Sequence, residues 1–197
     1  MTKLILLGAG LSKRMGRQKL LLPFGDKNVI ESVLDNLRNA GFREIYAVFS
    51  REVAAAVSPR EGLLIEINEA PERGQSSSLA IGLDMIPEGE DFCIMLGDLP
   101  LARAEDIAAL SARFDSLPSS KSVLTPCRDG VFGHPMFYRA IWRDRFRSAS
   151  GDAGGRNILR AYEGEIERVD APDGHFKDMD TPEEYEKRLR DLKSNSL

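Results

Sequence analysis

The sequence has little cysteine and no paired cysteine motif. Its 197 residues include two cysteines, Cys93 and Cys127, and no Cys-x-x-Cys spacing. This pattern excludes a disulfide framework and gives no zinc-site spacing. Cys93 lies within the apolar run 92–96, so it is expected to be a buried thiol of the core.

Long hydrophobic runs are also absent. The apolar segment at the start of the chain ends at Gly8-Ala9-Gly10, before it reaches the length of a signal peptide or a membrane span. No later stretch approaches that length. We therefore expect a soluble protein with no membrane association, and the cytoplasm is its default location.

The chain carries no excess of positive charge. It has 27 lysines and arginines against 31 aspartates and glutamates, a net charge of −4 and a pI of about 5.4. Such a charge does not attract nucleic acid. The one basic cluster, formed by Lys13, Arg14, Arg17 and Lys19, lies inside a glycine-rich segment. That placement favours a small phosphate ligand over a polymer.

Strand-like and helix-like segments alternate along the first two thirds of the chain. Expected strands lie at 3–7, 44–49, 63–67 and 92–96, and expected helices at 28–40, 53–57, 76–86 and 104–114. Asn28 is the expected N-cap of the first helix and Glu31 its capping-box partner. The alternation predicts an α/β fold with a mostly parallel sheet and helices on both faces. The length favours one domain, residues 1–192, followed by a polar tail at 193–197.

The rest of the chain is less regular. Its expected elements are strands at 121–126, 134–138 and 166–169, a loop at 151–155 and a helix at 156–162. Asp129-Gly130 is the expected turn between the first two strands. Thr181 is the expected N-cap of a last helix, with Pro182 in its first turn and Glu184 completing a capping box.

A glycine-rich segment follows the first expected strand. Residues 7–19 read Leu-Gly-Ala-Gly-Leu-Ser-Lys-Arg-Met-Gly-Arg-Gln-Lys. Glycines allow a sharp turn and let backbone amides approach a phosphate. The dinucleotide fingerprint fails at Lys13, and the Gly-Lys-Ser/Thr of a Walker A loop is missing. Ser12, Arg14 and Lys19 would offer a hydroxyl and two cations to a triphosphate. The alternative is a tight turn with solvated basic side chains.

Three aspartates are candidates for a metal site. Asp98 directly follows the strand expected at 92–96, and ligands of parallel sheets bind at the carboxyl ends of strands. There it could hold Mg²⁺ against phosphate oxygens, although a turn cap is the alternative. Asp178 and Asp180 precede the cap at Thr181. We expect them on opposite sides of an extended segment, one facing the site and the other capping or pairing. Favourable charge beside the helix dipole is the alternative for both.

Together these segments resemble the molybdenum cofactor nucleotidyltransferases, most closely the cytidylyltransferase branch. That family's pattern is Leu-Ala-Ala-Gly-x-Ser-x-Arg-Met-Gly-x-x-Lys, and residues 7–19 depart from it at Gly8. The other matches run in the family's order over nearly the whole chain: Asn68, Gly74, Ser77 and Ser78; Gly97–Pro100; Gly133-His134-Pro135; Gly151–Arg156; and Asp178–Pro182.

The resemblance implies a fold and a set of site residues. The fold would be a three-layer Rossmann-like sandwich of the nucleotide-diphospho-sugar transferase type. Arg14, Lys19 and Asp98 would be catalytic, and Asp98, Asp180 and Asp178 would hold Mg²⁺. His134, Asp152 and Arg156 would bind the acceptor. The nucleotide would be bound by Leu7, Gly8, Ala9, Gly10, Ser12, Arg14, Lys19, Asn68, Gly74, Ser77 and Ser78.

The resemblance also implies a reaction. A phosphate of molybdopterin would attack the α-phosphorus of a nucleoside triphosphate and release pyrophosphate. Ala9 and Ser12 fit the cytidylyl pattern and favour CTP, whereas Gly8 departs from it, and the guanylyl branch has glycine in this loop, typically as Leu-Ala-Gly-Gly. A molybdenum hydroxylase apoenzyme is a candidate partner. Alternatives are a non-catalytic molybdopterin-binding accessory protein, a guanylyltransferase, and a sugar-1-phosphate nucleotidyltransferase of the same fold.

Overall fold

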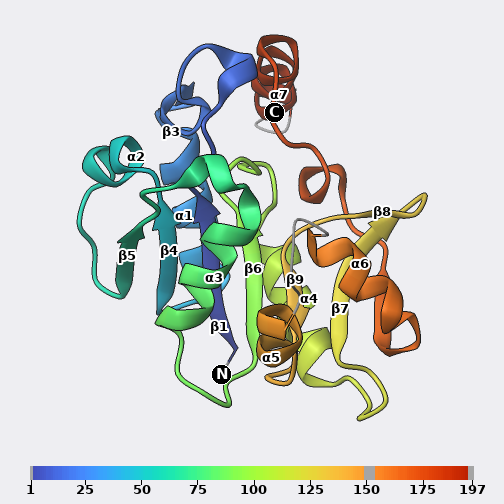
Figure 1. The fold of residues 1–197 in the computed structure, drawn as a ribbon. Coiled ribbons are helices and arrows are strands. Elements are labelled where there is room, and N and C mark those ends of the chain that lie inside the picture. The colour runs from blue at the N-terminus through green and yellow to red at the C-terminus, as the bar shows by residue number, and fades with distance from the viewer. Residues whose placement is uncertain (1, 149–153, 195–197) are drawn as a thin grey trace.

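A central sheet organises the chain. The computed structural model describes residues 2–148 and 154–194, and its main sheet runs in the order β10-β7-β9-β6-β1-β4-β5 (Figure 1). These strands are β1 (Lys3–Gly8), β4 (Ile45–Phe49), β5 (Leu63–Ile67), β6 (Phe92–Leu96), β7 (Val123–Arg128), β9 (Met136–Tyr138) and β10 (Ile166–Val169). A short strand, β8 (Val131–Phe132), pairs with β7 outside this path, and β2 (Pro23–Phe24) pairs with β3 (Lys27–Asn28) in a separate ribbon.

The sheet is mostly parallel, as the alternating pattern predicts. β1 runs parallel to both β4 and β6, β4 runs parallel to β5, and β7 runs parallel to β10. β9 is antiparallel to both of its neighbours, β6 and β7. The carboxyl ends of β1 and β6 therefore lie side by side, and the segments that follow them meet at one edge of the sheet.

Helices cover both faces of the sheet. They are α1 (Val29–Asn39), α2 (Arg51–Ala56), α3 (Gln75–Met85), α4 (Ala104–Asp115), α5 (Trp142–Ser148), α6 (Gly154–Ala161) and α7 (Pro182–Ser194). Figure 1 shows α3, α5 and α6 in front of the sheet, with α1 and α4 behind it. In β1, Leu4 and Leu6 join the core on the α1 side, whereas Ile5 and Leu7 join the core on the α3 side. This alternation confirms the three-layer arrangement.

The structure bears on two expectations from the sequence, a buried Cys93 and the lack of a membrane-spanning segment. Cys93 is fully buried in β6, and burial raises the pKa of its thiol well above the ordinary value, as suits a core residue. Within residues 2–148 and 154–194, no helix is both long and apolar enough to cross a membrane.

The two expected capping boxes have different outcomes. Asn28 caps α1, since its side-chain oxygen accepts a hydrogen bond from the amide of Glu31 at 2.9 Å. The Glu31 carboxylate is turned away to an ion pair with Arg60, so the expected box is wrong there. At α7 the box is complete: Thr181 Oγ1 accepts from the Glu184 amide at 3.3 Å, and Glu184 Oε2 accepts from the Thr181 amide at 2.9 Å.

The second half of the chain departs from the sequence pattern in several places. Asp129 and Gly130 form a turn, with φ of 51° and 77°, but it joins β7 to β8, and β9 starts later at Met136. Of the loop expected at 151–155, Gly154 and Gly155 belong to α6, and 151–153 lie outside the described residues. α5 was not predicted. α7 continues to Ser194, past the point where the tail is expected to begin.

Candidate active site

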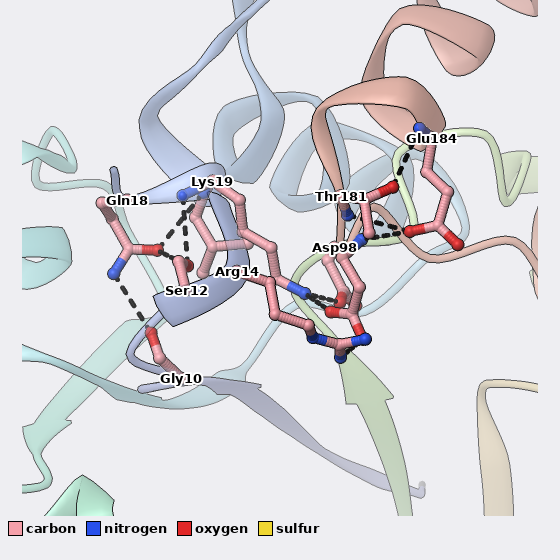
Figure 2. Close-up of polar contacts among 10 residues, drawn as sticks. Gly10, Ser12, Arg14, Gln18, Lys19, Asp98, Thr181 and Glu184 are labelled. Atoms are coloured by element: carbon pink, nitrogen blue, oxygen red, sulfur yellow. Dashed lines mark hydrogen bonds and ion pairs between the residues drawn. The ribbon is translucent and has the colours of Figure 1, made fainter. Parts of the chain in front are cut away.

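The glycine-rich loop is braced by its own side chains. Ser12 adopts a left-handed conformation, with φ of 48°, and its hydroxyl accepts from the Lys19 amide at 3.2 Å and donates to Gln18 Oε1 at 3.0 Å. Gln18 Nε2 in turn donates to the Gly10 carbonyl at 3.2 Å (Figure 2). The Ser12 hydroxyl therefore shapes the loop, and its proton is already donated within it. Sequence reasoning did not identify Gln18.

A cavity of about 380 Å³ opens at the carboxyl ends of β1 and β6. Its lining combines the glycine-rich loop, the start of α3 and the aspartates: Leu7, Gly8, Ala9, Gly10, Lys19, Leu20, Pro71, Gly74, Gln75, Ser78, Leu96, Gly97, Asp98, Asp178 and Asp180. The Gly97 amide donates to the Leu7 carbonyl at 2.9 Å, which extends the β1–β6 pairing by one bond and sets Asp98 at the cavity. Segments far apart in the sequence thus share one concave surface.

A smaller cavity of about 170 Å³ adjoins this one along the loop. It is lined by Gly10, Ser12, Lys13, Arg14, Lys19 and Asp180. Gly10, Lys19 and Asp180 line both cavities, so these residues mark where the two spaces meet. The smaller space is bounded by three basic side chains, which makes it chemically suited to phosphate oxygens.

Asp98, Asp178 and Asp180 form a carboxylate cluster. Each offers an oxygen, and these oxygens lie within 4.8 Å of one another. Asp98 is 8% exposed, and its Oδ1 is a buried atom without a hydrogen-bond partner among the described residues. Mg²⁺ and Mn²⁺ prefer carboxylate oxygens, and a buried unpaired oxygen is a costly feature that a cation would satisfy. The cluster therefore fits a divalent cation.

The expectation that Asp178 and Asp180 face opposite sides is wrong. Both line the large cavity, while Met179 between them is fully buried in the core. Residues two apart in an extended segment point to the same face, and the intervening residue points away. The burial of Met179 therefore places both carboxylates at the site.

Two cations from the loop neutralise most of this cluster. Lys19 Nζ lies 2.5 Å from Asp98 Oδ2 and 2.5 Å from Asp180 Oδ1, and Arg14 pairs with the other oxygen of Asp180 (Figure 2). The Lys19 side chain is 12% exposed, whereas that of Arg14 is 69% exposed. Three carboxylates against two cations leave one formal negative charge at the site.

The pKa shifts follow from this arrangement. Burial by itself would lower the pKa of Lys19, but Asp98 and Asp180 outweigh it and raise that pKa above the ordinary value. Burial favours a raised pKa for Asp180, yet its contacts with Lys19 and Arg14 lower the pKa. The pKa of Asp178 is raised, first by burial and then by the negative charges of Asp98 and Asp180. A cation bound at the cluster would offset the negative charges that act on Asp178.

Asn68 organises the start of α3. Its side-chain amide donates to Ser77 Oγ and Ser78 Oγ, each at 2.9 Å, and its carbonyl oxygen accepts from the Ala70 amide at 2.9 Å. Ser77 Oγ donates to the Gly74 carbonyl at 2.7 Å. Gly74 and Ser78 line the large cavity, whereas Asn68 and Ser77 support them from behind. These hydrogen bonds position Gly74 and Ser78 at the cavity, and the nucleotide contacts of Asn68 and Ser77 stay predictions.

Pro71 and Gln75 are lining residues that sequence reasoning missed. They lie between Asn68 and Ser78, so their place within the matched segment was the available signal. Gln75 is exposed, lines the cavity and carries a side-chain amide that can donate and accept hydrogen bonds. It is therefore a candidate contact for a polar group of the ligand.

Of the predicted acceptor residues, His134 is the one whose side chain is described. His134 is half-buried, and its Nδ1 donates to the Ile94 carbonyl at 3.1 Å. Burial lowers the pKa of His134, so the ring is neutral at pH 7. It lines neither of the two cavities described above. Asp152 and the side chain of Arg156 lie outside the described residues, so the acceptor site stays a prediction.

Gly8, where the sequence departs from the family pattern, has a packing explanation. A Cβ at this position would lie 2.8 Å from Phe49 Cδ1 and 3.0 Å from Leu20 Cδ1. Phe49 is fully buried in β4, so its ring occupies the space that an alanine methyl would need. Packing against Phe49 and Leu20 therefore explains the glycine at this position.

This explanation predicts that Gly8→Ala destabilises the fold. Forcing a methyl against a packed ring costs about 1–3 kcal/mol, which urea denaturation would measure. Gly10→Ala is the matched control, because a Cβ there meets nothing within 4 Å and Gly10 has no positive φ. Equal stability of the two variants would contradict the packing explanation.

Comparisons with known proteins agree with this geometry. Residues 4–167 match the family described as the MobA-like NTP transferase domain. The purine catabolism protein PucB of Bacillus subtilis (strain 168) is 26% identical to the chain over 195 residues, which cover 92% of this chain and 93% of PucB. The match confirms the family resemblance drawn from the ordered sequence motifs.

Solved structures confirm the fold. A nucleotidyl transferase from Methanothermobacter thermautotroptrophicus (Mth528) superposes with a TM-score of 0.83 at 21% identity, covering 99% of each chain. Rv0371c of Mycobacterium tuberculosis H37Rv, solved in complex with manganese, superposes with a TM-score of 0.76 at 20% identity, covering 96% of this chain and 98% of that one. The α/β sandwich expected from the sequence is thus the fold of known nucleotidyltransferases.

Proposed function

The chain belongs to the family of MobA-like NTP transferase domains, and we propose that it transfers CMP from CTP to the phosphate of a molybdopterin-type acceptor. The family makes it a nucleotidyltransferase; the nucleotide and the acceptor are our proposal. One observation carries the proposal: Lys19 of the glycine-rich loop forms ion pairs with Asp98 and Asp180 of the carboxylate cluster, so a phosphate-binding cation and a candidate metal site lie side by side.

The proposed reaction is a phosphoryl substitution. An oxygen of the acceptor phosphate attacks the α-phosphorus of CTP, and the bond from that phosphorus to the oxygen bridging to the β-phosphate breaks. Pyrophosphate leaves with that oxygen, and the CMP unit stays on the acceptor. Such a reaction requires positioning and charge stabilisation, with no nucleophile from the protein.

The main task of the site in this reaction is to neutralise the negative charge on the pyrophosphate leaving group. Lys19 lines both cavities, so a small movement of its Nζ turns it from the carboxylates toward phosphate oxygens. Arg14 lies on the rim of the smaller cavity with most of its side chain exposed, and it can follow the departing pyrophosphate. Asp98, Asp178 and Asp180 would hold Mg²⁺, which would neutralise negative charge on the triphosphate.

The choice of CTP and of molybdopterin rests on sequence. Ala9 and Ser12 keep the cytidylyl pattern, and Gly8 does not argue against it, because Phe49 explains that glycine. The Gly133-His134-Pro135 segment supports the cofactor branch over the sugar-1-phosphate branch. On this proposal the product serves a molybdenum hydroxylase apoenzyme, and the protein acts in the cytoplasm.

Pyrophosphate release tests the proposal. The protein is incubated with Mg²⁺, molybdopterin and either CTP, GTP or ATP, with reactions lacking acceptor or containing EDTA as controls. We expect release with CTP that requires both acceptor and metal. Preference for GTP would assign the chain to the guanylyl branch. Release from a nucleoside triphosphate that requires a sugar 1-phosphate in place of molybdopterin would move it to the sugar branch. Tight molybdopterin binding without release would favour the accessory-protein function.

A further inference from the structure

The segment that precedes Asp178 and Asp180 packs very closely against a neighbouring part of the chain. Asp173–His175 forms a 3₁₀ turn, and a Cβ added at Gly174 would lie 2.0 Å from the carbonyl oxygen of Leu101. Leu101 follows Asp98 by three residues. The turn is thus pressed directly against the chain that carries Asp98, at a distance only glycine permits.

His175 ties the same turn to the Gly133-His134 segment. Its side-chain Nδ1 donates to the His134 carbonyl at 2.6 Å, and its own carbonyl accepts from the His134 amide at 2.9 Å. A Cβ at Gly133 would lie 2.7 Å from the same carbonyl oxygen of His175. Two reciprocal hydrogen bonds and a close backbone contact therefore join these two residues.

The His175 ring is committed to this contact. It is 1% exposed, and burial lowers its pKa, so the neutral ring carries its proton on Nδ1. Its Nε2 has no hydrogen-bond partner among the described residues, and the nearest carboxylate, that of Asp106, is 3.9 Å away. The hydrogen bond from Nδ1 to the His134 carbonyl is therefore the polar contact of the ring that a substitution of His175 would remove.

A second anchor holds the chain just before this turn. Arg128 of β7 pairs with Asp170 and Asp173 and donates to the Ala171 carbonyl. The chain is thus fixed upstream by Arg128, at the turn by His175, and downstream by the buried Met179. Between the last two anchors lies Asp178, so the His175 bond sets where the carboxylate segment begins.

We propose that His175 is a positioning residue, which fixes the segment carrying Asp178 and Asp180 against the Gly133-His134 segment and so sets the geometry of the carboxylate cluster. The inference rests on the divalent-cation site of the proposed function. It assigns the His134 backbone a role in building the metal site.

Mn²⁺ binding, followed by electron paramagnetic resonance without nucleotide or acceptor, tests this assignment. Wild type is compared with His175→Asn, His175→Gln and His175→Leu. An Asn amide nitrogen stands near the place of Nδ1 and can donate to His134, whereas a Gln amide reaches the place of Nε2. Leu removes the donor altogether. Asn and Gln are therefore matched polar variants that differ in the one bond at issue.

We expect His175→Asn to bind Mn²⁺ like wild type, and His175→Gln and His175→Leu to bind about tenfold more weakly. Wild-type affinity in the Gln and Leu variants, or an Asn variant as weak as Leu, would overturn the assignment. If His175→Leu fails to fold, as thermal melting would show, the Asn–Gln comparison decides alone. Absence of Mn²⁺ binding by wild type would instead count against the metal site of the proposed function.

Discussion

Asp98→Asn is expected to lower the rate of pyrophosphate release by about a thousandfold, the scale of losing one preorganised charge contact in an active site. Asp98 is buried, its Oδ2 contacts Lys19, and its Oδ1 is unpaired. Asparagine keeps the shape and removes the charge, so the fold is preserved while a proposed cation ligand and a partner of Lys19 are lost. Steady-state pyrophosphate release at saturating nucleotide and Mg²⁺ measures the effect.

Asp84→Asn is the matched control for this prediction. Asp84 lies in α3, is exposed, and pairs with Arg147 outside both cavities. An exposed ion pair contributes little, so this variant should keep the wild-type rate. If Asp98→Asn also kept most of that rate, Asp98 would have only a structural part, and the metal would have to bind elsewhere.

Lys19→Met is expected to destabilise the protein in EDTA by about 3 kcal/mol, the range found when one partner of a buried ion pair is removed. The substitution leaves Asp98 and Asp180 close together without the cation that separates them. A divalent cation can take over that role, so Mg²⁺ should restore more stability to the variant than to wild type. Urea denaturation with EDTA and with Mg²⁺ measures both effects. Pyrophosphate release should fall at least about a hundredfold.

Lys27→Met controls for the loss of a lysine in general. Lys27 pairs with Asp35 at the surface, away from both cavities, and an exposed pair contributes little to stability. Mg²⁺ should change the free energy of unfolding of Lys27→Met by the same amount as that of wild type. The same response in Lys19→Met would show that Lys19 does not hold the place of a cation, whatever happens to activity.

The order of motifs in the sequence predicted much of the site. Lys19 and Asp98 are 79 residues apart, yet their side chains meet. This was predictable because each follows a buried parallel strand, and the carboxyl ends of such strands share one edge of the sheet. The helix cap at Thr181 was predictable for a local reason, since all of its hydrogen bonds lie within four residues.

Other contacts, in the site and at the cap of α1, are encoded by no local pattern. The Ser12 hydroxyl is turned to Gln18, Asn68 is turned to the serines of α3, and Glu31 is turned to Arg60. In each case the residue type allowed several partners, and the surrounding chain selected one. The nucleotide contacts predicted for Ser12 and Asn68 stay predictions, whereas the capping-box bond predicted for Glu31 is wrong, because that carboxylate pairs with Arg60.

The sequence by itself determined the α/β class, the position of the glycine-rich loop and the three carboxylates, because hydrophobic period and chain order dictate which segments end at the same edge of a sheet. Tertiary structure alone decided which atoms meet there. Met179 is buried in the core, so both neighbouring aspartates face the cavity. Phe49 fills the space beside Gly8, and a hydrogen bond from His175 joins two segments that are distant in sequence. These outcomes depend on close packing between segments remote in sequence, and packing is settled only when the whole core forms.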